Sequence, residues 1–109
     1  MFIGYTKGSP VIKGTYAEQD AMRLYRAGCD MVYSSESAYD WADMCKNMQP
    51  GDTLVMVRQE DVPEIIDFDT LVIVLDMIAN SAVMLLDDAD NLHLVTPKAK
   101  YGRITTDDI

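Results

Sequence analysis

The chain has 109 residues, of which 49% are hydrophobic and 25% are charged. This is the composition of one folded domain, and it excludes both a disordered chain and a protein with two separate cores. The formal net charge is −9, and the excess of acid lies between residues 59 and 97, where no Lys or Arg occurs. Because DNA and RNA binding needs Lys and Arg to neutralise phosphates, direct nucleic-acid binding is not expected. The acidic half is either a solubilising surface or a binding surface.

The amino-terminal part of the chain predicts a strand followed by a helix. Residues 1–6 form a short aromatic and β-branched run that is followed by glycine and proline, which predicts a buried strand. Thr15 and Glu18 have the spacing of a capping box, so a helix is expected to start there and to end at Gly28. We expect its apolar stripe to consist of Ala21, Met22, Leu24 and Tyr25.

A second strand and a second helix are expected next. Residues 30–33 predict the strand, and Ser37 together with Asp40 predicts the start of the helix. Apolar side chains then recur at the spacing i, i+3, i+4 and i+7, which is typical of a helix packed on a core. We expect this stripe to be packing rather than a cofactor site, and it consists of Trp41, Met44, Cys45 and Met48.

The third strand follows a tight turn. Residues 49–52 read Gln-Pro-Gly-Asp, which predicts the turn, and residues 53–57 are a continuous apolar run, typical of a parallel strand covered on both faces. Either Asp67 or Asp69 is expected to cap a third helix that runs to about residue 79.

The last elements are two short strands. Residues 81–86 predict a fourth strand, residues 87–91 a turn, and residues 92–95 a fifth strand. The alternation of strands and helices predicts a single α/β domain over residues 1–95, with a mainly parallel sheet of four to five strands and helices on both faces. Residues 96–109 are expected to be a polar, flexible tail. A functional site is expected at the carboxyl edge of the sheet.

Neither a membrane segment nor a metal-binding pattern is predicted. The longest uncharged apolar run, residues 71–75, is far shorter than the roughly 20 residues of a membrane helix, and the first residues do not resemble a signal peptide, so a cytoplasmic protein is expected. Cys29 and Cys45 are expected to be reduced thiols in the core. His93 is interpreted as a structural residue and the acidic turn at residues 87–91 as solvated, so no metal and no cofactor are predicted.

Several segments, in order and correctly spaced, resemble one known family. Residues 1–9 read MFIGYTKGS, residues 27–33 read AGCDMVY, residues 41–56 read WADMCKNMQPGDTLVM, and residues 68–86 read FDTLVIVLDMIANSAVMLL. These segments are similar to the catalytic domain of the serine recombinases, the resolvase and invertase group. The resemblance covers about residues 1–95, and it implies a resolvase-like sheet.

The resemblance also implies a chemistry, and this chain departs from its requirements. In the family a serine attacks a DNA phosphodiester, and clustered arginines stabilise the extra negative charge of the transition state. Ser9 stands at the nucleophile position, but Lys7 replaces one arginine, and Asp61 and Glu64 stand where the family's DRLxR motif has arginines. Reversing two unit charges about 8 Å from a phosphate disfavours the transition state by roughly 8 kcal/mol, on the order of six decades in rate. Ser9 is therefore a vestigial nucleophile, and no residue is expected to be catalytic.

The sequence thus predicts a degenerate, truncated recombinase-like protein without catalytic activity. The resemblance implies a phage or mobile-element origin, and we expect a regulator or inhibitor that binds another macromolecule, foremost a protein. A variant of this hypothesis makes the acidic half a mimic of DNA that occupies a nucleic-acid-binding protein. The expected binding residues are Glu60, Asp61, Glu64, Asp67, Asp87, Asp88 and Asp90.

Two alternatives stay open. If Ser9 acts with Lys7, the protein is instead an enzyme, namely a minimal DNA strand-transferase or nuclease. Dimerisation is open as well, although the family's long dimerisation helix and its DNA-binding domain are not expected in residues 96–109.

Overall fold

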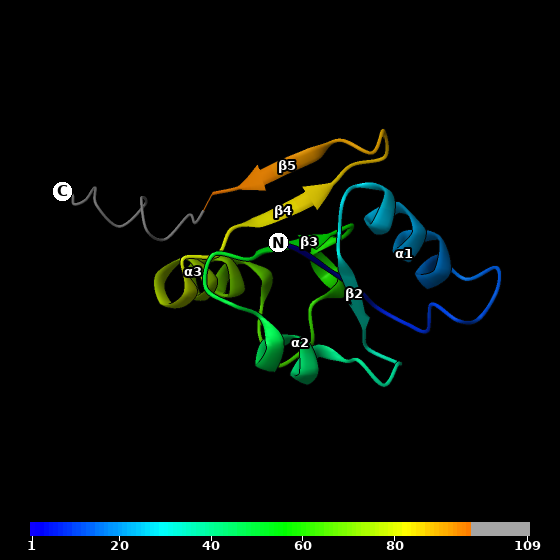
Figure 1. Ribbon diagram of the computed structural model, residues 1–109, viewed down its shortest axis with the longest axis horizontal. Helices are drawn as coiled ribbons and strands as arrows, with labels where there is room; N and C mark the ends of the chain where they lie inside the picture. The colour runs from blue at the N-terminus through cyan, green and yellow to red at the C-terminus, as the bar shows by residue number, and fades with distance from the viewer. Residues whose placement is uncertain (97–109) are drawn as a thin grey trace.

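A single five-stranded sheet organises the chain, with the strand order β2-β1-β3-β4-β5. The computed structural model describes residues 1–96, so the tail expected at residues 96–109 lies outside the described residues except for Thr96. The first four strands are parallel, and the edge strand β5 runs antiparallel to β4 (Figure 1). The strands are β1 (Phe2–Thr6), β2 (Met31–Ser34), β3 (Thr53–Met56), β4 (Val83–Leu86) and β5 (Leu92–Val95).

Three helices cover the two faces of this sheet. Helix α1 (Tyr16–Arg26) packs on one face, and α2 (Trp41–Asn47) and α3 (Phe68–Ala79) pack on the other (Figure 1). A short 3-10 helix, η1 (Gln59–Asp61), follows β3. The predicted α/β domain with a mainly parallel sheet and helices on both faces is confirmed. Within the described residues, none of the helices is long and apolar enough to cross a membrane.

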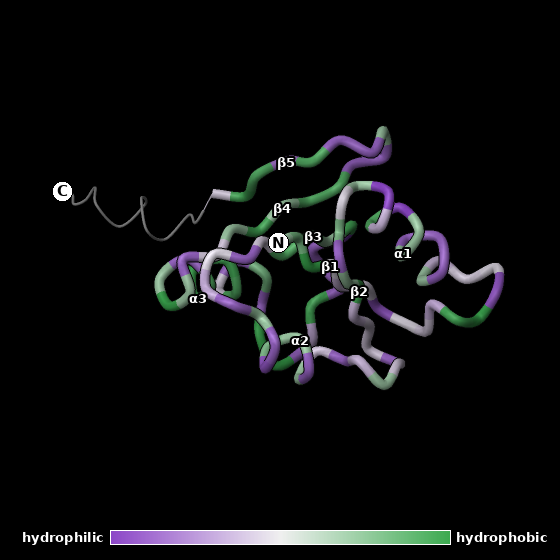
Figure 2. The backbone as a smooth tube through the Cα atoms, in the orientation of Figure 1, coloured by the Kyte–Doolittle hydropathy of each residue, from purple (hydrophilic) through white to green (hydrophobic). Residues whose placement is uncertain are grey.

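The strands alternate their side chains between two apolar layers, and Figure 2 shows the hydrophobic colour along β1, β3 and β4. Tyr5 and Leu54 face α2 and α3, whereas Val55 faces α1. Gly4 also faces α1, and a Cβ atom there would lie only 3.2 Å from the Leu24 side chain. Glycine therefore lets α1 pack closely on the sheet.

The first helix starts as predicted but buries a different stripe. The Thr15 hydroxyl accepts the Glu18 N–H at 3.2 Å, which confirms the N-cap, although the Glu18 carboxylate accepts from Gly14 N–H instead of closing a reciprocal box. The expectation for Met22 and Tyr25 is wrong, because their side chains are 54% and 51% exposed. A helix buries positions three or four apart, and the face toward the sheet is formed by Ala17, Asp20, Ala21 and Leu24.

The second helix starts later than predicted. Asp40 is its N-cap and forms a reciprocal capping box with Asp43, whereas the Ser37 hydroxyl donates to Tyr39 C=O within the preceding loop. Met44 is buried as expected, but Cys45 is exposed, so its assignment to the core is wrong. Both residues fit the same apolar spacing, and only the orientation of this two-turn helix separates them.

The sequence offered two candidate N-cap residues for the third helix, and the structure decides between them. Asp67, rather than Asp69, is its N-cap, since its carboxylate accepts the Thr70 N–H at 2.8 Å. Asn80 ends the helix in the left-handed conformation, with φ of 51°.

Candidate functional site

The candidate site lies where the strand order reverses. From β1 the chain crosses to β2 on one side, and later strands are added on the other side, so the loops after β1 and β3 diverge at their carboxyl ends. In open parallel sheets this is where ligands bind. Lys7 and Ser9 follow β1, residues 57–67 follow β3, and residues 87–91 follow β4. The structure therefore brings all of the sequence-predicted site residues to one edge.

Ser9 sits in the loop that leads into α1. Its carbonyl accepts from Ile12 N–H at 3.3 Å and from the Thr15 hydroxyl at 3.4 Å, so its backbone is part of a turn. The side chain is half-buried, and no hydrogen bond of its hydroxyl is seen within residues 1–96. Lys7 is exposed and acts on Asp61 electrostatically. Among the described residues, none is hydrogen-bonded to the Ser9 hydroxyl as a general base would be.

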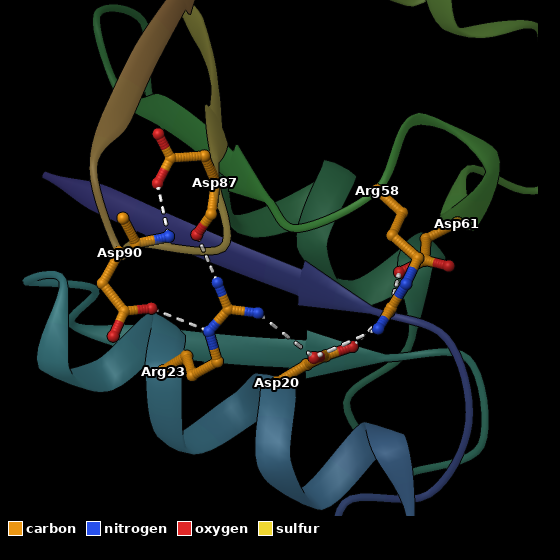
Figure 3. A network of polar contacts seen from close by, with 7 residues as sticks. Asp20, Arg23, Arg58, Asp61, Asp87 and Asp90 are labelled. Carbon is orange, nitrogen blue, oxygen red and sulfur yellow. Dashed lines mark hydrogen bonds and ion pairs between the residues drawn. The ribbon is translucent and has the colours of Figure 1, made fainter.

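Arg58 is the cation that follows the end of β3, and it is engaged by two carboxylates. Its guanidinium donates to both oxygens of Asp20 on α1, with the longer contact at 3.5 Å, and it lies 3.6 Å from Asp61 (Figure 3). The Tyr16 ring lies 5.7 Å from the guanidinium carbon. Asp20 is only 3% exposed, so its negative charge is inside the protein and needs this cation. The hydrogen bond with Asp20 is the main reason that the pKa of Arg58 is raised.

A second arginine extends this cluster to the β4–β5 hairpin. Arg23 lies one turn after Asp20 on α1, with the two side chains 3.9 Å apart, and its Nε donates to Asp90 at 2.8 Å. It also donates to the carbonyl of Asp87. Figure 3 shows the resulting row of alternating charges, which ties residues 58–61, α1 and the hairpin together. We call this row the charge row, and its members are Asp61, Arg58, Asp20, Arg23 and Asp90.

Asp61 is the member of the charge row whose buried carboxylate is incompletely hydrogen-bonded. It is 7% exposed, and its Oδ2 atom makes no hydrogen bond within the described part of the chain, although Arg58 lies nearby. Burial raises its pKa above the ordinary value of 3.8, and the opposing attraction of Arg58 does not offset this. The carboxylate is thus less stable in the folded protein than in water.

Replacing Asp61 with Asn is therefore expected to raise the free energy of unfolding at pH 7. The raised pKa means that the ionised carboxylate destabilises the folded state, so the gain should shrink as the pH falls toward 3.8 and the acid becomes protonated. Urea unfolding at pH 7 and pH 4 measures this difference, with the exposed Asp30→Asn as the matched control. A loss of stability at pH 7 would show that the Arg58 contact outweighs burial.

The predicted binding acids differ in their exposure to solvent. Glu60, Glu64 and Asp88 are exposed, and their side chains make no hydrogen bond or ion pair within the described residues; we call them the open acids. Asp67 is exposed as well, but its carboxylate caps α3, and the hydrogen bonds from Thr70 lower its pKa. Asp61 is interior, so it cannot contribute to a solvent-facing acidic surface.

The hairpin acids are largely occupied by internal bonds. Asp87 accepts from Ala89 N–H and Asn91 N–H at 2.9 Å each, and from His93 at 2.5 Å. The Asn91 and His93 bonds lower the pKa of Asp87. Asp90 is held by Arg23, so within this turn Asp88 is the acid that remains open. In the described residues no group of three or more His, Cys, Asp or Glu could hold a metal ion.

The depression at this edge does not suit an anion. It has a volume of about 320 Å³ and is lined by Tyr5, Ser35, Asp40, Trp41, Ala42, Pro63 and Ile65. These residues include one carboxylate and neither Lys nor Arg. The Tyr5 hydroxyl is hydrogen-bonded to the Ser35 side chain. Burial raises the pKa of Tyr5, so the phenol stays protonated.

The residues at the centre of the cluster were not predicted from the sequence; they are Asp20, Arg23 and Arg58. One signal for Asp20 was present, since it falls on the stripe of Ala17, Ala21 and Leu24, where a lone acid needs a buried partner. The identity of that partner, 38 residues away in the chain, was not readable from spacing.

Comparisons with protein-family models, with curated proteins and with solved structures found no match. The geometry of the carboxyl edge and the chemistry of its side chains therefore carry the functional inference.

Proposed function

We propose that the protein is a catalytically inactive, serine-recombinase-like domain that acts by binding another protein. The similar segments fall on β1, on the passage from α1 to β2, on α2 with β3, and on α3 with β4. Each therefore lies on the type of element that the resemblance assigns to it. This collinearity supports the resolvase-like part of the proposal, and a phage or mobile-element regulator is the corresponding role.

The observation that carries the proposal is the engagement of Arg58 by Asp20 and Asp61. Phosphoryl-transfer chemistry needs open guanidinium groups aimed at the phosphate, because negative charge builds up in the transition state. Here the guanidinium after β3 faces two interior carboxylates, and the three side chains carry one net negative charge. A net unit charge of this sign about 8 Å from a phosphate costs roughly 2 kcal/mol, which opposes catalysis.

The open acids indicate the chemistry of the partner. Glu60 and Glu64 follow β3 and Asp88 follows β4, so they lie on neighbouring loops of one edge, where they face solvent without a hydrogen bond or ion pair in the described part of the chain. A basic surface complements them, including the DNA-binding face of another protein if the edge acts as a DNA mimic.

A binding experiment tests this role directly. The wild-type protein is immobilised, and proteins retained from a host lysate are compared with those retained by Glu60→Gln/Glu64→Gln/Asp88→Asn. The matched control removes three exposed acids that do not belong to the open acids, Asp30→Asn/Glu36→Gln/Asp69→Asn. We expect a partner that wild type and control retain, that the first variant loses, and that elutes as salt rises. Identical retention by all three proteins would contradict the proposal.

The enzyme alternative rests on Ser9, whose hydroxyl has no hydrogen-bond partner within residues 1–96. A strand-transferase or nuclease would leave a covalent serine–DNA adduct on supercoiled plasmid. We expect no adduct with wild type or with Ser9→Ala. An adduct that wild type forms and Ser9→Ala does not would establish the enzyme and overturn the inactive assignment.

A further inference from the structure

The depression at the carboxyl edge has aromatic and apolar walls. Tyr5 and Trp41 both line it, and their rings meet edge to face, with centroids 4.9 Å apart and an interplanar angle of 83°. Because Tyr5 is buried in the core, this contact helps to hold Trp41 in place. Pro63 and Ile65 form the wall that follows β3, and Ile65 is 85% exposed. The depression therefore offers a fixed aromatic wall beside an exposed apolar side chain.

The same depression contains one carboxylate, that of Asp40. Its Oδ1 atom accepts the Asp43 N–H at 3.2 Å. No hydrogen bond to its Oδ2 atom and no ion pair of Asp40 is seen among residues 1–96. Asp40 can therefore accept a hydrogen bond from a ligand while it still caps α2.

The rim of the depression is acidic as well. Glu64, one of the open acids, directly precedes Ile65 in the chain. Lys7 and Arg58, the cations of the loops after β1 and β3, do not line the depression, and Arg58 is engaged within the charge row. The negative charges of the wall and the rim are therefore not neutralised from inside the depression.

The Tyr5 phenol, which belongs to the wall, responds to this charge. Burial is the main reason that the pKa of Tyr5 is raised, and the negative charges of Asp40 and Asp61 raise it further. A phenol becomes negative when it loses its proton, so these two contributions mean that the potential at the wall is negative. The depression therefore favours a positively charged ligand.

The composition of the walls favours an organic cation over a metal ion. A metal ion such as Ca²⁺ needs six or more oxygen ligands, and the depression contains one carboxylate. An organic cation is attracted to aromatic rings, and a guanidinium is planar, is more weakly hydrated than an ammonium and also pairs with carboxylates. The volume of about 320 Å³ lies at the lower end of the range for ligand sites, which suits a single side chain.

We propose that this depression binds an arginine side chain of the partner protein. The guanidinium lies beside Trp41 and donates to the Oδ2 atom of Asp40, and Glu64 adds attraction at the rim. The aliphatic part of the arginine packs on Pro63 and Ile65. Arginine is one of the residue types that most often dominate the binding energy of an interface. The inference rests on the proposed protein-binding role, and it specifies the residue that the partner presents.

A titration with a short arginine peptide tests the depression in the absence of the partner. Trp41 is the single tryptophan of the chain, so its indole N–H signal in NMR spectra reports on this site. Acetyl-Gly-Arg-Gly-amide should shift the signals of Trp41 and Ile65 with a Kd on the order of millimolar, because one side chain makes few contacts. The same peptide with neutral citrulline should bind about tenfold more weakly or less. A lysine peptide that binds as tightly as the arginine peptide would overturn the choice of arginine.

Two N-cap substitutions form a matched pair for this titration. Asp40→Asn removes the charge from the depression but keeps a good N-cap, so α2 should still form. Asp67→Asn makes the same change at the N-cap of α3, and Asp67 does not line the depression. We expect Asp40→Asn to weaken binding of the arginine peptide about fivefold or more, and Asp67→Asn to change it less than about twofold. Equal losses in the two variants would show that general acidity attracts the peptide, and an unchanged Kd in Asp40→Asn would likewise overturn the proposal.

Truncation of the apolar wall provides a second variant. Ile65→Ser removes a side chain that is 85% exposed, so the fold should not depend on it, and it should weaken the arginine peptide about twofold or more. The control is Val11→Ser, which removes a side chain that is 84% exposed and does not line the depression. Equal Kd values for Ile65→Ser and Val11→Ser would contradict the contact with the arginine stem.

The titration and the lysate experiment distinguish this inference from the proposed function. If a partner is retained through the open acids but the arginine peptide binds Asp40→Asn as tightly as wild type, the arginine site is wrong and the binding role stands. If the peptide depends on Asp40 while wild type and the open-acid variant retain the same proteins, the arginine site stands and the proposed function is wrong.

Discussion

Replacing Arg58 with Ala should lower the free energy of unfolding by about 3–5 kcal/mol, the cost of leaving buried charges without their partner. The side chains of Asp20 and Asp61 are only 4% and 8% exposed, so water cannot take over the role of the guanidinium. Arg23 remains near Asp20, but at 3.9 Å it is a weaker contact. Urea unfolding measures the loss, provided that the slope of the free energy of unfolding against urea concentration is the same in the variant and the wild type.

The pH dependence of Arg58→Ala separates charge from packing. Without Arg58, the factor that lowers the pKa of Asp61 is lost, while the burial that raises it stays. The variant should therefore recover part of its stability as the pH falls from 7 toward 4, since a protonated Asp61 is no longer a buried charge. Arg26→Ala removes an exposed arginine in the last turn of α1 and should change stability by no more than about 0.5 kcal/mol. Equal losses in the two variants would contradict the role of Arg58.

Replacing Asp20 with Ala should cost about 2–3 kcal/mol, less than the loss of Arg58, because the groups left behind are better solvated. The Arg58 side chain is 36% exposed and keeps Asp61, and Arg23 keeps its bond with Asp90. The exposed Glu36→Ala is the control, with an expected change within about 0.5 kcal/mol. Urea unfolding measures both variants, and a loss for Asp20→Ala as small as that of the control would contradict its structural role.

A double-mutant cycle joins the two substitutions. Because Asp20 and Arg58 contact each other directly, Asp20→Ala/Arg58→Ala should lose less than the sum of the single variants, with a coupling of about 0.5–3 kcal/mol. Additive losses would mean that the two side chains stabilise the fold separately. The cycle also bears on the proposed function, since a strongly coupled pair leaves Arg58 unavailable to a phosphate.

The contrast between Asp20 and Asp61 shows how position changes the role of one residue type. Both are interior acids beside Arg58, yet Asp20 receives two contacts from the guanidinium, whereas the Asp61 carboxylate lies 3.6 Å away with one oxygen atom lacking a hydrogen bond. Removing Asp20 is expected to destabilise the protein, and neutralising Asp61 is expected to stabilise it. Asp61 was predicted to be a binding residue because it belongs to the acidic half of the chain and stands at a former arginine position of the resembled family.

The order and type of the elements were readable from local patterns. Apolar runs bounded by turn residues indicated each strand to within two residues. Capping depends on side chains a few positions apart, so Thr15 was found as a cap and the cap of the third helix was narrowed to Asp67 or Asp69. The error at the start of α2 also involves residues close together in the chain. Ser37 and Asp40 are both good capping residues, and the backbone path of the preceding loop favours the second.

The charge row, in contrast, depends on contacts between residues far apart in the chain. Asp20 and Arg58 are 38 residues apart, and Arg23 and Asp90 are 67 apart, so no helical or strand period connects them. Parallel strands bring the loops after β1, β3 and β4 to one edge, and α1 crosses beside them. Composition and periodicity reveal the strands, helices and overall acidity because these depend on near neighbours. Which acids face solvent and which neutralise an arginine is set by the packing of α1 against the sheet.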